Sequence, residues 1–135
     1  MNFENIQVGD EVVYSGKITK VIMKDQERMV CDISDNYIKD WGCLNPVEIT
    51  DVRLLYAGYT RGIRDANLFL KTIYRKGTMD KIVECHINKT EDGYLMHIHC
   101  HPDNKIGELN NVKVKYLVEI ARLEEAFRIV ASEKL

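Results

Sequence analysis

The sequence predicts an α+β protein: an N-terminal SH3-like small β-barrel, a short helix, and an antiparallel sheet packed against a C-terminal amphipathic helix. Three observations favour this class. Short β-rich runs joined by tight turns fill the N-terminal third, longer alternating runs follow, and an apolar helical period ends the chain. With 135 residues, 45% of them hydrophobic, the chain can form one compact unit of two lobes, at 1–49 and 50–135.

The first lobe begins with a hairpin signal. Residues 12–14 are β-rich, Ser15-Gly16 suits a tight turn, and residues 17–23 form a second β-rich run. A third strand is expected over 28–33, and Pro46 is expected to end the lobe. A meander of this size must close or be covered to hide its edges, so an SH3-like barrel is the first choice.

A short helix is expected between the lobes. Thr50 can cap it, because its hydroxyl can accept a hydrogen bond from the first turn. Leu54, Leu55 and Ala57 supply the buried side, and Gly58 permits a left-handed stop. Two turns are too few for an isolated helix, so this one must pack on a neighbour.

The second lobe is expected to hold an antiparallel sheet with strands at 68–74, 82–88 and 94–101, and a further strand near 112–114. The C-terminal helix is marked by large residues that recur at spacings of four and three, which places them on one face. These residues are Tyr116, Ile120, Leu123, Phe127 and Val130. That face is expected to cover the sheet.

All four histidines lie in one predicted hairpin, with His86 on one strand and His97, His99 and His101 on the other. Because side chains alternate along a strand, the histidines share a face with Glu84, while sulfur and aliphatic side chains occupy the opposite, core face. The sharpest functional signal in the sequence is therefore this polar face.

Two registers of the hairpin are open. A loop of Glu91-Asp92 pairs His86 with His97, whereas a loop of Asp92-Gly93 pairs His86 with His99. Both registers keep the same residues on the same face.

Neighbouring imidazoles beside a carboxylate are ligands that Zn²⁺ accepts. The candidate metal ligands are His86, His97, His99 and Glu84. Glu84 or Asp103 could also act as a general base, which would make the protein a metal-dependent hydrolase. Because the spacing matches no named metal motif, two other interpretations stay open: a face that contacts a ligand or protein, and a merely solvated face without a cofactor.

Basic and aromatic side chains gather between residues 51 and 81. Such side chains can bind anions and stack on rings. The candidate ligand-binding residues are Tyr59, Arg61, Arg64, Lys71, Arg75, Lys76 and, in the first lobe, Trp41. A net charge of −2 gives no global attraction to phosphate backbones, so a nucleic-acid-binding module is an alternative that charge does not favour.

Cysteines and apolar stretches bear on the compartment. The four cysteines contain no Cys-x-x-Cys pair, so we expect reduced, mostly buried thiols. No apolar stretch approaches the roughly 20 residues of a membrane span, and the N-terminus has no signal-peptide pattern. We expect a cytoplasmic protein with no membrane contact.

An open sheet edge would allow a homodimer.

Three segments, Val8 to Tyr14, Asn45 to Asp51 and Val112 to Glu119, resemble uncharacterised small proteins encoded by phages and mobile elements of Bacteroides-like bacteria. The resemblance implies a mobile-element origin, a place in the host cytoplasm and interference with a host defence system. It carries over no functional residues. Together with the lack of a catalytic motif, it leads us to expect a non-enzymatic binding protein that engages a host protein or a small anionic ligand.

Overall fold

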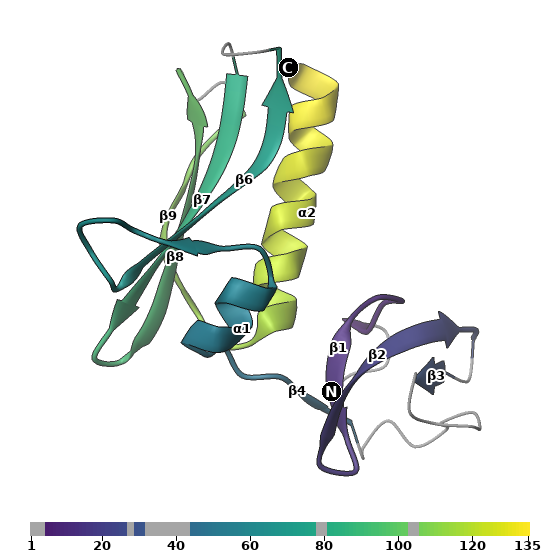
Figure 1. Cartoon of the computed structure of the whole chain (residues 1–135). Coiled ribbons are helices and arrows are strands. Elements are labelled where there is room, and N and C mark those ends of the chain that lie inside the picture. The colour runs from purple at the N-terminus through teal and green to yellow at the C-terminus, as the bar shows by residue number, and fades with distance from the viewer. Residues whose placement is uncertain (1–4, 27–28, 32–43, 78–80, 103–105) are drawn as a thin grey trace. The chain divides into compact units, whose positions relative to one another are not determined.

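The computed structural model describes residues 5–26, 29–31, 44–77, 81–102 and 106–135. The chain divides into two compact units, Met1–Glu48 with Tyr116–Val118, and Ile49–Lys115 with Glu119–Leu135. Each unit contains one antiparallel sheet, and a long helix ends the chain (Figure 1). The predicted α+β class is confirmed.

The first unit contains a sheet of strand order β3-β2-β1-β4. Its strands are β1 (Glu11–Tyr14), β2 (Lys17–Lys24), β3 (Met29–Cys31) and β4 (Leu44–Pro46). The predicted hairpin is confirmed: Tyr14 pairs with Lys17, and both turn residues have positive φ, 51° at Ser15 and 76° at Gly16. Two left-handed residues give a two-residue turn the twist that adjacent strands require.

The described strands of this sheet do not close on themselves, because β3 and β4 lie at its two ends. The predicted SH3-like barrel is therefore not confirmed. Pro46 is the last residue of β4, so it ends the last strand of the lobe as predicted, although it is itself paired with Val12. Since β4 has one neighbour in the described sheet, a missing N–H can be tolerated there. Within the described residues, the core of this unit consists of Ile6, Val12, Val21, Met29, Cys31 and Leu44.

The predicted short helix is confirmed as α1 (Asp51–Tyr56). The Thr50 hydroxyl accepts a hydrogen bond from the Arg53 N–H at 3.2 Å, and Gly58 has a φ of 97°. Leu54 is fully buried, as expected, but Leu55 is 42% exposed, so its predicted burial is wrong.

The second unit is organised around a five-stranded meander whose strands neighbour one another in sequence order. The strands are β5 (Thr60–Arg61), β6 (Leu68–Lys76), β7 (Lys81–Thr90), β8 (Gly93–His101) and β9 (Leu109–Val114). The three long strands were predicted with slightly shorter bounds. Sequence reasoning missed β5, which has two residues, and placed the start of β9 at Val112 rather than Leu109.

Helix α2 (Leu117–Lys134) runs along one face of this sheet (Figure 1). Its buried positions are Ile120, Glu124 and Ala131. Leu123 and Phe127 of the predicted stripe are only half-buried. The face of α2 that is buried is therefore rotated about the helix axis from the predicted face. It includes the carboxylate of Glu124.

The sheet face toward α2 is apolar, as alternation predicts. Its central side chains are all at most 4% exposed: Val83, Cys85, Ile87, Met96, Ile98 and Cys100. None of the helices in the described parts of the chain is long and apolar enough to cross a membrane.

Candidate functional site

The β7–β8 hairpin adopts the first of the two predicted registers. Thr90 pairs with Gly93, so Glu91 and Asp92 form the loop, and His86 lies opposite His97. In the same register Glu84 lies opposite His99. The predicted sorting of side chains is confirmed, because the alternate positions Cys85 and Ile98 are buried toward α2.

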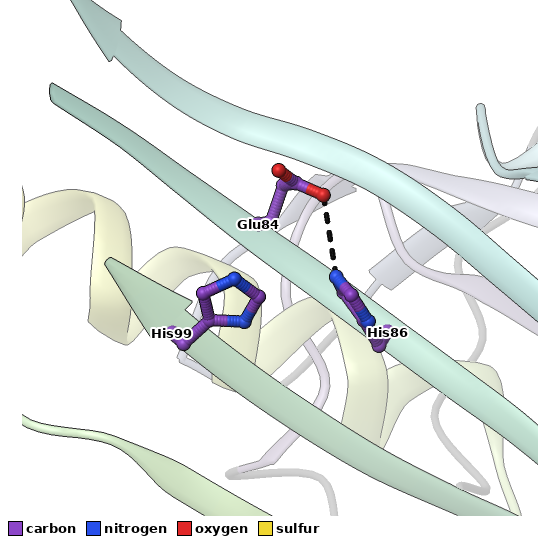
Figure 2. Close-up of side chains that lie close together, drawn as sticks. All are labelled: Glu84, His86 and His99. Atoms are coloured by element: carbon purple, nitrogen blue, oxygen red, sulfur yellow. Dashed lines mark hydrogen bonds and ion pairs between the residues drawn. The ribbon is translucent and has the colours of Figure 1, made fainter. Parts of the chain in front are cut away.

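The opposite side of the hairpin carries what we call the histidine face, which consists of Glu84, His86, His97, His99 and His101. Glu84 and His86 project from β7, and His99 projects from the neighbouring strand, with α2 behind the sheet (Figure 2). The side chains of Glu84, His86 and His97 are 28%, 27% and 23% exposed. They are therefore reachable from solvent while the sheet restricts their motion.

The imidazole rings form a continuous cluster. Ring centroids of His86 and His99 are 4.8 Å apart, those of His97 and His99 are 5.3 Å apart, and those of His86 and His97 are 6.0 Å apart. His101 lies at its margin, 4.9 Å from His99. Three of the four rings therefore surround one small volume above the sheet.

Two carboxylates accompany the rings. Glu84 Oε1 lies 3.2 Å from His86 Nε2, and Glu108 Oε1 lies 3.3 Å from His97 Nε2. Glu108 was missed by sequence reasoning, because it comes from the segment just before β9. The pairing of Ile98 with Leu109 brings it beside β8. A prediction that β9 begins at Leu109 would have placed Glu108 next to the strand that carries His97.

Ligand atoms of Glu84, His86 and His99 all lie within 4.8 Å of one another. Ligands on a tetrahedral zinc ion lie roughly 3.4 Å apart, given metal–ligand bonds of about 2.1 Å. The Glu84–His86 pair, at 3.2 Å, already has about this spacing, and no ligand atom of the triplet is more than 4.8 Å from another. Three of the four predicted metal ligands thus form the tightest group, and His97 lies next to it.

His99 has an unusual environment. Its Nδ1 is buried and finds no hydrogen-bond partner among the described residues. Burial, aided by the neighbouring His86, lowers the pKa of His99. The ring is therefore neutral at pH 7, which is the form that binds metal ions.

The predicted ligand-binding residues do not form one surface. Tyr59 is only 2% exposed, and burial raises its pKa, so it offers no stacking surface. Lys71 Nζ lies 2.9 Å from both carboxylate oxygens of Glu124 and 5.2 Å from the centre of the Tyr59 ring. These two residues therefore belong to the interior that joins β6 to α2.

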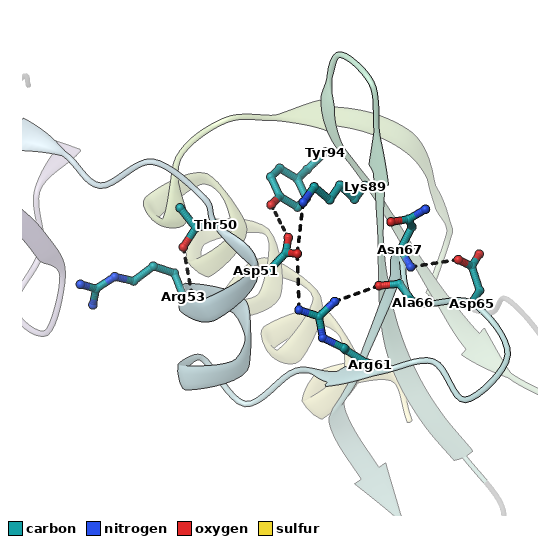
Figure 3. A network of polar contacts seen from close by, with 9 residues as sticks. All are labelled: Thr50, Asp51, Arg53, Arg61, Asp65, Ala66, Asn67, Lys89 and Tyr94. Atoms are coloured by element: carbon teal, nitrogen blue, oxygen red, sulfur yellow. Dashed lines mark hydrogen bonds and ion pairs between the residues drawn. The ribbon is translucent and has the colours of Figure 1, made fainter.

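The remaining basic candidates are dispersed. Arg61 bonds to Asp51 at 3.4 Å and to the Ala66 carbonyl at 3.0 Å (Figure 3). Lys76 donates to the backbone oxygen of Leu135. Arg64 and Arg75 are exposed. Trp41 and the alternative base Asp103 lie outside the described residues.

Asp51, at the start of α1, is the centre of a small network of polar contacts (Figure 3). It accepts hydrogen bonds from the Tyr94 hydroxyl at 2.7 Å and from Lys89 Nζ at 3.1 Å. The Tyr94 hydrogen bond, together with the charges of Lys89 and Arg61, lowers the pKa of Asp51. This network fixes α1 to the hairpin and engages the charges of Lys89 and Arg61 in ion pairs with Asp51.

The described cysteines suit a structural role. Cys31, Cys85 and Cys100 are buried, as predicted, and are reduced thiols. Burial raises the pKa of Cys85 to about 12, so it is not a nucleophile at neutral pH. Cys43 lies outside the described residues.

Comparison of the chain with family models, curated proteins and solved structures finds no match. The resemblance to phage and mobile-element proteins therefore stays a prediction.

Proposed function

We propose that this protein binds a divalent transition-metal ion of the zinc type on the histidine face, with Glu84, His86 and His99 as ligands. The observation that supports this function most directly is the grouping of their ligand atoms within 4.8 Å. Imidazole nitrogen with one carboxylate suits zinc, cobalt and nickel, whereas magnesium and calcium require mostly oxygen ligands.

The scaffold favours such a site because the ligands lie on the central part of the sheet. Strands β7 and β8 are flanked by β6 and β9, so neither is an edge. Glu84 and His99 are directly opposed, which fixes the distance between their Cα atoms. Ligands on paired interior strands need little reorganisation to bind an ion.

His99 supplies a second argument. A buried polar atom without a hydrogen bond costs roughly 1 to 3 kcal/mol, and Nδ1 of His99 is such an atom among the described residues. Coordination to an ion, directly or through a ring rotation that exposes Nδ1, would remove this cost.

Zinc titration of the untagged protein by calorimetry, with elemental analysis of the purified complex, tests the proposal. We expect one ion per chain. The double variant His86→Ala/His99→Ala should lose binding at least tenfold. His101→Ala is the matched control, because it also removes a histidine of this hairpin but not one of the three ligands. Equal binding by the double variant and the wild type would contradict the proposal.

A second candidate function is engagement of a protein partner such as a host protein, and one observation favours it. Val52, Leu55 and Tyr56 are 57%, 42% and 82% exposed, and their spacing places them on one face of α1. Clustered exposed apolar side chains are typical of interaction sites.

This second function is tested by affinity capture from a lysate of a Bacteroides-like bacterium. We expect Val52→Ser/Tyr56→Ser to lose a partner that the wild type and the control Ile129→Ser retain, since Ile129 is a comparably exposed apolar residue on α2. A partner retained equally by all three proteins would exclude α1 as its binding surface.

A further inference from the structure

We infer that His97 is a fourth ligand of the same ion and that Glu108 holds it in position, so that the site encloses the ion and sequesters it. This inference rests on the proposed function, because it concerns the ion bound by Glu84, His86 and His99. It adds a residue that the sequence did not indicate, and it decides between an ion-storing site and a catalytic one.

Ring geometry supports the fourth ligand. On a tetrahedral ion with zinc–nitrogen bonds of about 2.1 Å, imidazole centres lie roughly 3.2 Å from the ion and therefore about 5 Å from one another. The observed separations are 4.8 Å for His86–His99, 5.3 Å for His97–His99 and 6.0 Å for His86–His97. The His86–His99 and His97–His99 separations are close to this spacing, and the His86–His97 separation is the widest of the three.

Glu108 supplies the orienting contact. Its Oε1 lies 3.3 Å from Nε2 of His97, so Nε2–H is the natural donor and Nδ1 keeps the lone pair for the ion. Metal-binding histidines commonly donate their second ring N–H to a carboxylate, which fixes both the tautomer and the ring plane. Glu108 is therefore a positioning residue.

Four protein ligands have a functional consequence. A catalytic zinc site keeps one position for water or substrate, whereas a site with four protein ligands has none. The set of three nitrogens and one oxygen also selects zinc, cobalt, nickel or copper against magnesium and calcium. With His97 as a fourth ligand, the site would capture a transition-metal ion and would not act as the metal-dependent hydrolase that the sequence left open.

Cobalt substituted for zinc in the untagged full chain reports the coordination sphere through its visible spectrum. We expect one Co²⁺ per chain and a spectrum that added azide does not change. His97→Ala should still bind one Co²⁺, but azide should now shift its spectrum, because the lost imidazole leaves a position open. A wild-type spectrum that responds to azide as the variant does would overturn the inference and leave the proposed function standing.

The variant Glu108→Gln tests the inference independently, because it leaves every proposed ligand in place. We expect its Co²⁺ affinity to fall 10- to 100-fold with the stoichiometry unchanged. Asn110→Ala, an exposed change on β9, is the control and should bind as the wild type does. Two ions per chain, or undiminished affinity of Glu108→Gln, would overturn the inference, whereas a wild type that binds no Co²⁺ would overturn the proposed function with it.

Discussion

Lys71 and Glu124 are 53 residues apart in the sequence, yet the Lys71 ammonium lies 2.9 Å from each oxygen of the Glu124 carboxylate. Glu124 is 4% exposed, so this is a buried ion pair between β6 and α2. A third hydrogen bond runs from Lys71 to the carbonyl of Ala57 at 2.8 Å. One ammonium group therefore joins the sheet, the long helix and the end of α1.

Removing one partner of this pair should cost more than removing both. Lys71→Met leaves the Glu124 carboxylate buried, and among the described residues only Arg128, 3.7 Å away, then offsets its charge. We expect a loss of about 3 kcal/mol in the free energy of unfolding, and Lys71→Met/Glu124→Leu should recover most of it. Urea denaturation measures both values. The exposed change Lys113→Met is the control, and a single variant as stable as this control would contradict the prediction.

The same pair shows where sequence reasoning reaches its limit. The helical period correctly places Ile120 toward the sheet, but Glu124 carries no local sign of burial. Its partner lies on a strand in another part of the chain, so only the tertiary fold reveals that its charge is compensated. The predicted stripe of large residues was therefore rotated from the buried face.

The histidine face could be predicted because its determinants are local. Alternation is a property of each strand, and the short loop between Thr90 and Gly93 sets the pairing of His86 with His97. Glu108 could not be predicted in the same way. It reaches His97 across β8 and β9, whose register shifts between Met96 and Ile98, and such an irregularity has no signature in alternation.

Alkaline pH should destabilise the fold through Cys85. Burial raises its pKa to about 12, above the value of 9.0 for an exposed thiol. Between these values the unfolded chain has lost a proton that the folded chain keeps, so stability falls as pH rises. We expect a loss of about 1 to 2 kcal/mol between pH 9 and 10.5, smaller in Cys85→Val. Denaturation midpoints across this range measure the difference, and identical slopes would refute the assignment to Cys85.

Acid should weaken the attachment of α1 through Asp51. The Tyr94 hydrogen bond and the neighbouring cations lower the pKa of this carboxyl below 3.8, so its contribution is present above about pH 4 and is lost as pH falls through the folded-state value. Asp51→Asn should cost about 1 to 2 kcal/mol at neutral pH, while a matched change at the exposed hairpin tip, Asp92→Asn, should cost little. The difference between the two variants should shrink toward pH 3. A constant difference would exclude ionisation of Asp51 as its cause.

Zinc should stabilise the folded chain by mass action. An ion that binds only the native histidine face at 100 times its dissociation constant adds about 2.7 kcal/mol to the free energy of unfolding. Protons compete with the ion for imidazole lone pairs, so the gain at about pH 5.5 should be smaller than at about pH 7.5. Thermal unfolding with zinc, with magnesium and with zinc plus a chelator measures the effect. His86→Ala/His99→Ala should show a clearly smaller zinc-dependent shift, because it lacks two of the ligands, and an equal shift in this variant would assign the stabilisation to a site elsewhere on the chain.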